Sequence, residues 1–206
     1  MVSLYSPLSK ASSTSTTSMT NPAPLEQLDK ELTDWLLTLP AHLQFRSVQQ
    51  EPGTFVSMLH MTFYSILILL HRPYSHQTFP ELQDHSSISI NICTSAANNA
   101  IEIASNMRRN ADNRGVVRIK GLLHNSVFIC FTAGIVHITN CTSSDPTLAA
   151  SARLRAIETM RCMDALEDVW LTARFAAENL QRLLKIRSIE LPGASDGMFY
   201  SFILCH

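Results

Sequence analysis

The sequence predicts an all-α protein, a multi-helix domain with two nearly all-apolar central helices and amphipathic helices around them. Three observations favour this fold class. Apolar residues recur at three- and four-residue spacing, two apolar runs are longer than ordinary strands, and glycine and proline are few, with 6 and 9 of 206 residues. No stretch shows the strict alternation of a half-buried strand. We therefore expect helices throughout the domain.

Three segments differ in composition. Residues 1–24 are rich in Ser, Thr and Pro and hold too little apolar surface to offset the entropy of ordering, so we predict a disordered leader or linker. Residues 25–187 carry the helical patterns and form the predicted domain. Residues 188–206 contain two glycines and an apolar end without a period, and their structure stays open.

The first helix is predicted to begin at Pro24 and to end before Pro40. Its apolar residues follow helical spacing: Leu25, Leu28, Leu32, Trp35, Leu36 and Leu39. We expect its charged residues to face away from the core: Glu26, Asp29, Lys30 and Glu31.

Two apolar runs predict buried helices. In residues 55–70, twelve of sixteen residues are apolar, and Pro73 disfavours helix at the residue before it, so this helix should end at Arg72. We interpret His60 and His71 as satisfied core or helix-end side chains. The run 122–138 predicts the second buried helix, with Gly134 as a point of close contact; a buried strand is the alternative, which its length disfavours. Both runs fall just short of the roughly 18 residues of a membrane span, so we expect no membrane insertion.

The other helices are predicted from caps. Ser86 or Ser87 should cap a helix lined by small residues, and Asp145-Pro146 fits a cap followed by proline at the first helical position. We divide the 147–191 stretch near Asp164, because Asp164 and Glu167 have the spacing of a capping-box variant. An apolar stripe follows: Leu166, Trp170, Ala173, Ala177, Leu180 and Leu184.

Charge and cysteine content exclude several functions. The net charge of −1 indicates no field for nucleic acid or anionic membrane. The five cysteines include no Cys-x-x-Cys pair, which favours buried thiols over disulfides or zinc. One polar cluster is interpreted as a solvated loop: Glu81, Asp84 and His85. A basic cluster is interpreted as a solvated surface, with binding to an acidic partner as the alternative: Arg108, Arg109, Arg114, Arg118 and Lys120. We find no nucleophile or phosphate-binding motif and predict that the chain is not an enzyme.

Four motifs in order carry a family resemblance. The most specific is LHMTFYSILILLHRPY, residues 59–74, an apolar helix with an internal tyrosine that ends in Leu-His-Arg-Pro and an aromatic. The others are a Trp…Leu-Pro segment, a Cys-x-x-Ala-Ala element and a closing Trp-x-x-Ala pattern. Together they resemble the regulatory domain of fungal binuclear-zinc-cluster transcription factors, over residues 25–187. The structural signature residues are Trp35, Tyr64, His71, Arg72, Pro73, Tyr74, Cys93, Ala96, Ala97, Trp170 and Ala173.

The resemblance implies the C-terminal part of such a domain in a nuclear regulator of RNA polymerase II transcription. The family's six-cysteine DNA-binding cluster is not in these residues, so the resemblance implies DNA contact only through that missing N-terminal cluster, and zinc only there. It carries over no catalytic, cofactor-binding or metal-ligating residue. Protein partners, a small effector and a homodimer fit it, and a membrane does not.

Two alternatives stay open. One is a stand-alone helical module that binds a protein or a small apolar ligand without DNA. The other is an enzyme, which only turnover that depends on His71, His85 or Glu81 would support.

Overall fold

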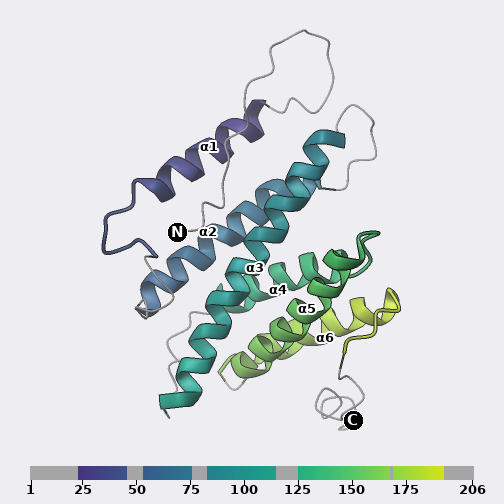
Figure 1. The fold of residues 1–206 in the computed structure, drawn as a ribbon. Coiled ribbons are helices and arrows are strands. Elements are labelled where there is room, and N and C mark those ends of the chain that lie inside the picture. The colour runs from purple at the N-terminus through teal and green to yellow at the C-terminus, as the bar shows by residue number, and fades with distance from the viewer. Residues whose placement is uncertain (1–22, 46–52, 76–82, 115–124, 168, 193–206) are drawn as a thin grey trace.

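The computed structural model describes residues 23–45, 53–75, 83–114, 125–167 and 169–192 (Figure 1). Within these residues the chain is helical and contains no strand, which confirms the predicted all-α fold class. The helices are α1 (Ala23–Leu37), α2 (Thr54–His71), the short 3-10 helix η1 (Arg72–Tyr74), α3 (Gln83–Arg114), α4 (Asn125–Asn140), α5 (Pro146–Glu167) and α6 (Leu171–Ile186).

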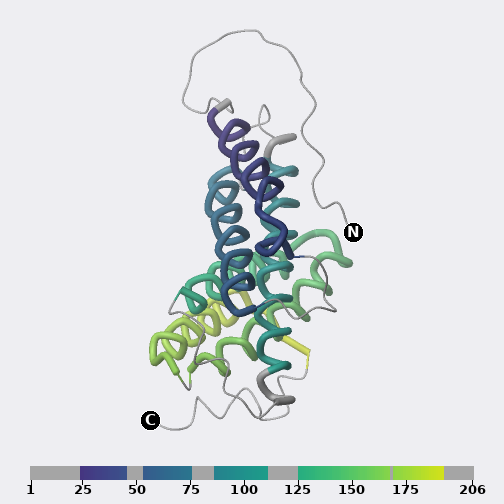
Figure 2. The backbone as a smooth tube through the Cα atoms, turned by 90° about the vertical axis from the view of Figure 1, so that its left-hand side faces the viewer, coloured from purple at the N-terminus to yellow at the C-terminus, as the bar shows by residue number. Residues whose placement is uncertain are grey.

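The helices form two groups that are joined by α3. Helices α1 and α2 run side by side with one half of α3, and α4, α5 and α6 gather at its other half (Figures 1 and 2). Helix α4 packs on α2, α3, α5 and α6, whereas α1 packs chiefly on α2. Helix α1 is therefore at the edge of the bundle.

Helices α2, α3, α4, α5 and α6 share one apolar core. Its largest fully buried apolar side chains come from all five of these helices: Met61, Ile68, Ile101, Ile129, Met163 and Leu180. Helix α1 adds only the partly buried Leu32 and Leu36 to this core. The bundle therefore has a core of its own without α1.

Helix α2 ends at His71, one residue before the predicted end, and Pro73 lies in the following 3-10 turn, as expected from its missing N–H group. Together Thr54–Tyr74 is long and apolar enough to cross a membrane by length and composition, so the expectation that this run is too short was wrong. Half of the most apolar part of this segment is buried inside the protein, and α1, α3 and α4 pack on α2. These contacts favour a core helix over a membrane span.

Helix α3 is longer than predicted. It begins at Gln83, before the predicted cap at Ser86 or Ser87, and continues to Arg114. No glycine or proline interrupts the chain between Gln83 and Arg114, so nothing in the local sequence stops the helix there. Because α3 spans both groups of helices, it is as central to the bundle as the two apolar helices.

The boundary between α5 and α6 also differs from the prediction. Asp164 lies inside α5 and caps nothing, and the break comes at Trp170, whose extended backbone (φ −129°, ψ 106°) precedes α6. The predicted cap of α5 is confirmed, since the N–H of Thr147 donates to Asp145 Oδ1 at 2.8 Å. Two acidic residues three positions apart were therefore not enough evidence to predict where one helix ends and the next begins.

Gly134 is a point of close contact, as predicted. A Cβ atom added to it would lie 2.7 Å from Leu180 Cδ1 of α6 and 3.1 Å from Thr159 Cγ2 of α5. The missing side chain therefore lets α4 approach both neighbours.

Some predictions lie outside the described residues. These are the leader up to residue 22, the segment 115–124, the polar loop around Glu81 and the tail from residue 193. Of the predicted tail, residues 188–192 are described, and Ile189 and Leu191 pack against the core.

Candidate functional site

The signature residues of the sequence fall into two separate places. Tyr64 and His71 lie on α2, Arg72, Pro73 and Tyr74 form η1, and Trp35 reaches α2 from α1. Trp170 and Ala173 lie at the start of α6, which packs on α4 and α5. The motif that resembles a regulatory domain is therefore centred on the C-terminal end of α2.

Aromatic rings hold α1 on α2. The ring of Trp35 stacks on that of Phe63, with centroids 6.0 Å apart, and Tyr64 meets Phe63 edge-on at 5.5 Å. Burial raises the pKa of the Tyr64 hydroxyl. Such pairs add about 0.5–1.5 kcal/mol beyond the burial of their area.

The Cys-x-x-Ala-Ala element brings α3 onto α2. Ala97 is fully buried, and the Cys93 thiol donates to the Ile68 carbonyl across 3.8 Å. Burial raises the pKa of the Cys93 thiol to about 12, against the opposing charge of Arg72. These side chains are small, which lets the two helices come close.

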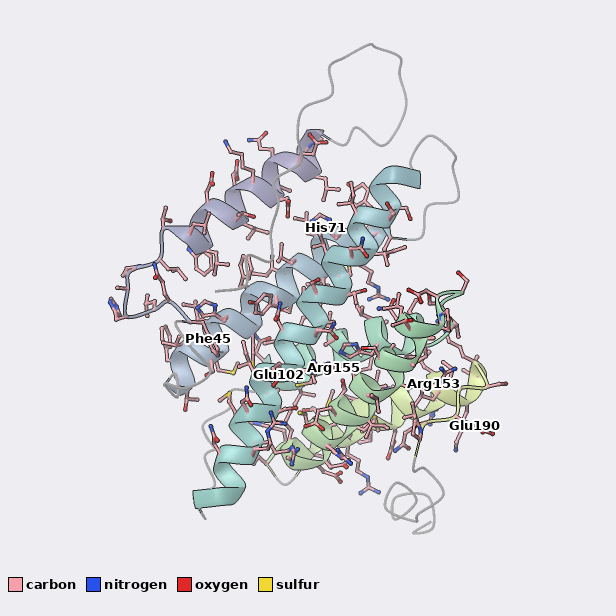
Figure 3. All side chains as sticks on the ribbon, in the orientation of Figure 1. Phe45, His71, Glu102, Arg153, Arg155 and Glu190 are labelled. Atoms are coloured by element: carbon pink, nitrogen blue, oxygen red, sulfur yellow. The ribbon has the colours of Figure 1, made fainter. Side chains whose placement is uncertain are left out.

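His71 joins three helices through buried polar contacts. Its Nε2 lies 3.0 Å from Asp29 Oδ1 of α1, and its Nδ1 lies 3.3 Å from Ser89 Oγ of α3. The exposed fractions are 2% for His71, 5% for Asp29 and 1% for Ser89. Because a carboxylate only accepts hydrogen bonds, Nε2 carries the proton toward Asp29. We call these three residues the latch; Figure 3 labels His71 beside α1 and α3.

The latch corrects one prediction and completes another. Asp29 was expected to face away from the core, yet it lies in line with Leu25 and Leu32 on the face that meets α2. His71 is the satisfied helix-end histidine that was expected. His60 is satisfied as well, since its Nε2 donates to the Leu43 carbonyl at 2.9 Å.

The order Asp–His–Ser invites comparison with a hydrolase triad, and the geometry argues against it. A nucleophile must meet its substrate, but Ser89 is only 1% exposed. The arrangement therefore suits fixing the positions of helices better than catalysis.

A second polar cluster joins α3 to α5. Glu158 accepts hydrogen bonds from Ser105 at 2.6 Å and from Arg108 at 3.0 Å, and Arg155 pairs with Glu102 at 2.8 Å. Figure 3 shows Glu102 and Arg155 side by side. Burial alone would raise the pKa of Glu158, but the bonds from Ser105, Arg108 and Arg161 lower it to about 2.

This cluster bears on the basic stretch noted in the sequence. Arg108 and Arg109 both approach Glu158, so their charges are matched within the chain. The side chain of Arg114, and Arg118 and Lys120, lie outside the described part. An acidic partner for this stretch therefore gains no support from its first two arginines.

The four described cysteines are buried, as predicted: Cys93, Cys130, Cys141 and Cys162. Burial raises the pKa of Cys130 well above its usual value and that of Cys162 to about 11. Within the described residues no group of three or more His, Cys, Asp or Glu side chains could hold a metal ion. Cys205 and the Glu81, Asp84 and His85 side chains lie outside that part.

His137 makes stability depend on pH. It is 1% exposed on α4, and burial, helped by the charge of Arg155, lowers its pKa to about 3 despite a hydrogen bond to Ala97. The pKa in the unfolded chain is about 6.5. Below that pH the unfolded chain binds a proton that the native chain does not, so stability falls as the pH falls toward 3.

We expect this residue alone to lower the free energy of unfolding by about 2 kcal/mol between pH 7 and pH 5. Urea denaturation at both pH values measures the loss in the wild type and in His137→Gln, which cannot titrate. The variant should lose about 2 kcal/mol less than the wild type over this interval. Equal losses in both proteins would show that His137 is not held neutral.

The chain is similar to several regulatory proteins of fungi. It is 34% identical over 140 residues to an acetamidase regulatory protein of Aspergillus fumigatus, which covers 68% of this chain and 17% of that protein. It is 30% identical over 176 residues to the protein of the same name in Aspergillus oryzae, covering 82% and 22%. An uncharacterized transcriptional regulatory protein of Schizosaccharomyces pombe is 28% identical over 82 residues, covering 39% and 13%.

The names of these relatives describe regulatory proteins rather than enzymes, and one of them describes a transcriptional regulatory protein. It spans at most 22% of the length of the three relatives described above. No protein-family model matches the chain, and no solved structure does.

Proposed function

We propose that this chain is part of the regulatory domain of a fungal transcription factor that acts in the nucleus on RNA polymerase II transcription. The observation that carries the proposal is the similarity to an acetamidase regulatory protein over 82% of the chain. The Leu-His-Arg-Pro-Tyr motif and the all-α fold agree with it. Genes for acetamidase are the first candidate targets, by analogy with the names of the relatives.

In this proposal the chain itself does not bind DNA. Its net charge of −1 gives no attraction to phosphates, and a DNA-binding zinc cluster would belong to a part of the protein outside these residues. The helical bundle would instead transmit a signal from a partner. Two cavities lined by described residues measure about 10 and 30 Å³, roughly the space of one water or a few, so neither of these two would hold a small organic effector.

A second candidate is a binding module without DNA contact. Large apolar side chains on several helices favour it, because they are exposed in the bundle: Leu37, Phe55, Leu154, Leu171, Phe175 and Ile186. These side chains suit a protein partner in either candidate.

The two candidates are separated by mapping the 5′ end of the native transcript and by tagging the complete gene product at its own locus. The proposal expects a reading frame with a six-cysteine cluster and a product that is concentrated in nuclei. A product that stays out of the nucleus would contradict it. A nuclear product without such a cluster would favour the binding module.

A further inference from the structure

Helix α1 is the helix with the fewest anchors in the described bundle. Only two of its residues are buried, Leu25 and Asp29, while Leu28, Trp35 and Leu37 are 48%, 42% and 71% exposed. It packs chiefly on α2, at the edge of the molecule, where both views place it apart from α4, α5 and α6 (Figures 1 and 2). Local opening should therefore release α1 before the rest of the bundle unfolds.

The surface beneath α1 is apolar and ends in a polar contact. Phe63, Leu67 and His71 follow one side of α2 at helical spacing and are at most 4% exposed. Phe63 meets Trp35, and His71 meets Asp29. We call these three residues, together with Ser89 of α3, the α1-binding face.

The latch contributes selectivity more than strength. Removing two polar groups from water offsets much of the attraction between them, so a buried pair adds little net stability. A helix with no acceptor at this point, however, would leave the His71 N–H unpaired, and a neutral amide would accept a weaker hydrogen bond than a carboxylate does. The face therefore favours an amphipathic helix with one inward carboxylate about two turns before an aromatic residue, the spacing of Asp29 and Trp35.

We propose that the α1-binding face is a docking surface for an amphipathic helix of this kind, supplied by a protein partner, and that α1 occupies it as a built-in competitor. The occupant is defined by α1 itself, which shows the chemistry that the face accepts. This inference rests on the contacts of α1 and stands whether or not the chain regulates transcription.

Hydrogen exchange of the complete purified chain tests the first half of the proposal. We expect the amides of α1 to exchange through local opening, at rates that rise little with low urea, while those of α3, α4 and α5 follow global unfolding. Asp29→Asn should speed exchange in α1 and leave α4 and α5 unchanged. The exposed Glu26 gives a matched control, since Glu26→Gln makes the same change of charge on the outer face.

A labelled peptide with the sequence of residues 23–40 tests the second half. Because α1 competes in the same chain, the peptide should bind the Asp29→Asn chain about tenfold more tightly than the wild-type or Glu26→Gln chain. A peptide that itself carries Asp29→Asn should lose that gain, because it brings no carboxylate to His71.

Two results would overturn the proposal. One is exchange of α1 only through global unfolding. The other is an Asp29→Asn chain in which α1 opens but the 23–40 peptide binds no more tightly than to the wild type. Equal binding of this peptide and of the peptide that carries Asp29→Asn would count in the same way. If Asp29→Asn does not fold, Leu25→Ala weakens α1 without touching His71 and serves in its place.

Discussion

Replacing His71 by alanine is expected to lower the free energy of unfolding by about 3 kcal/mol, the upper end for leaving a buried polar group without its hydrogen-bond partner. The substitution removes the contacts with both Asp29 and Ser89 and leaves a cavity where three helices meet. Asp29→Asn should cost less. Opening of α1 returns the changed side chain to water, and Ser89 of α3 stays beside His71 in the bundle.

Urea denaturation followed by circular dichroism at pH 7 measures these losses. His42 is exposed, so His42→Ala is a matched control that should change stability by less than about 0.5 kcal/mol. If His71→Ala were as mild as His42→Ala, the latch would hold nothing together.

Replacing Gly134 by valine is expected to cost about 3 kcal/mol, the upper end for overpacking a core. Even its Cβ would lie 2.7 Å from Leu180 Cδ1 and 3.1 Å from Thr159 Cγ2, and both neighbours are buried. Gly134→Ala should cost less, because Leu180 can turn its side chain and alanine favours the helix.

Two comparisons make this prediction specific. Gly53 is the N-cap of α2 and has no atom within 4 Å of an added Cβ, so Gly53→Ala meets no clash and should cost at most about 1 kcal/mol, the loss of a weaker N-cap. In a Leu180→Ala background, Gly134→Val should lose part of its cost, because the clashing side chain is gone. Equal costs in both backgrounds would show that the two residues do not meet.

The fold class and most helix positions could be predicted because they depend on local periodicity. The apolar run of α2, its end near Pro73 and the cap at Asp145 all follow from residues close in sequence. The break between α5 and α6 could not, because α5 ends at Glu167 and α6 begins after the extended backbone of Trp170, which has no side-chain cap.

Of the three residues of the latch, only His71 was singled out from the sequence. His71 was singled out by its place in the motif, but its partners lie 42 residues before it and 18 after it, and pairing at such distances is set by the fold. A signal for Asp29 did exist: the series Leu25, Asp29, Leu32 and Leu36 is itself a helical stripe with one carboxylate in it. A charge inside an apolar stripe predicts a buried partner.

The pairs between α3 and α5 show the same limit. No feature of the sequence singles out Glu102 or Glu158, and only the packing of the two helices brings them to Arg155 and Arg108. The sequence therefore predicted the elements and the core, whereas contacts between distant helices needed the structure.

RNA sequencing of a strain that lacks the gene would show whether the chain belongs to a regulator of transcription, as we propose. We expect a restricted set of transcripts to change, to return with the wild-type gene, and to return only in part with the His71→Ala gene at equal protein level. Transcripts that are indistinguishable from those of the parent strain under every growth condition tested would contradict the claim.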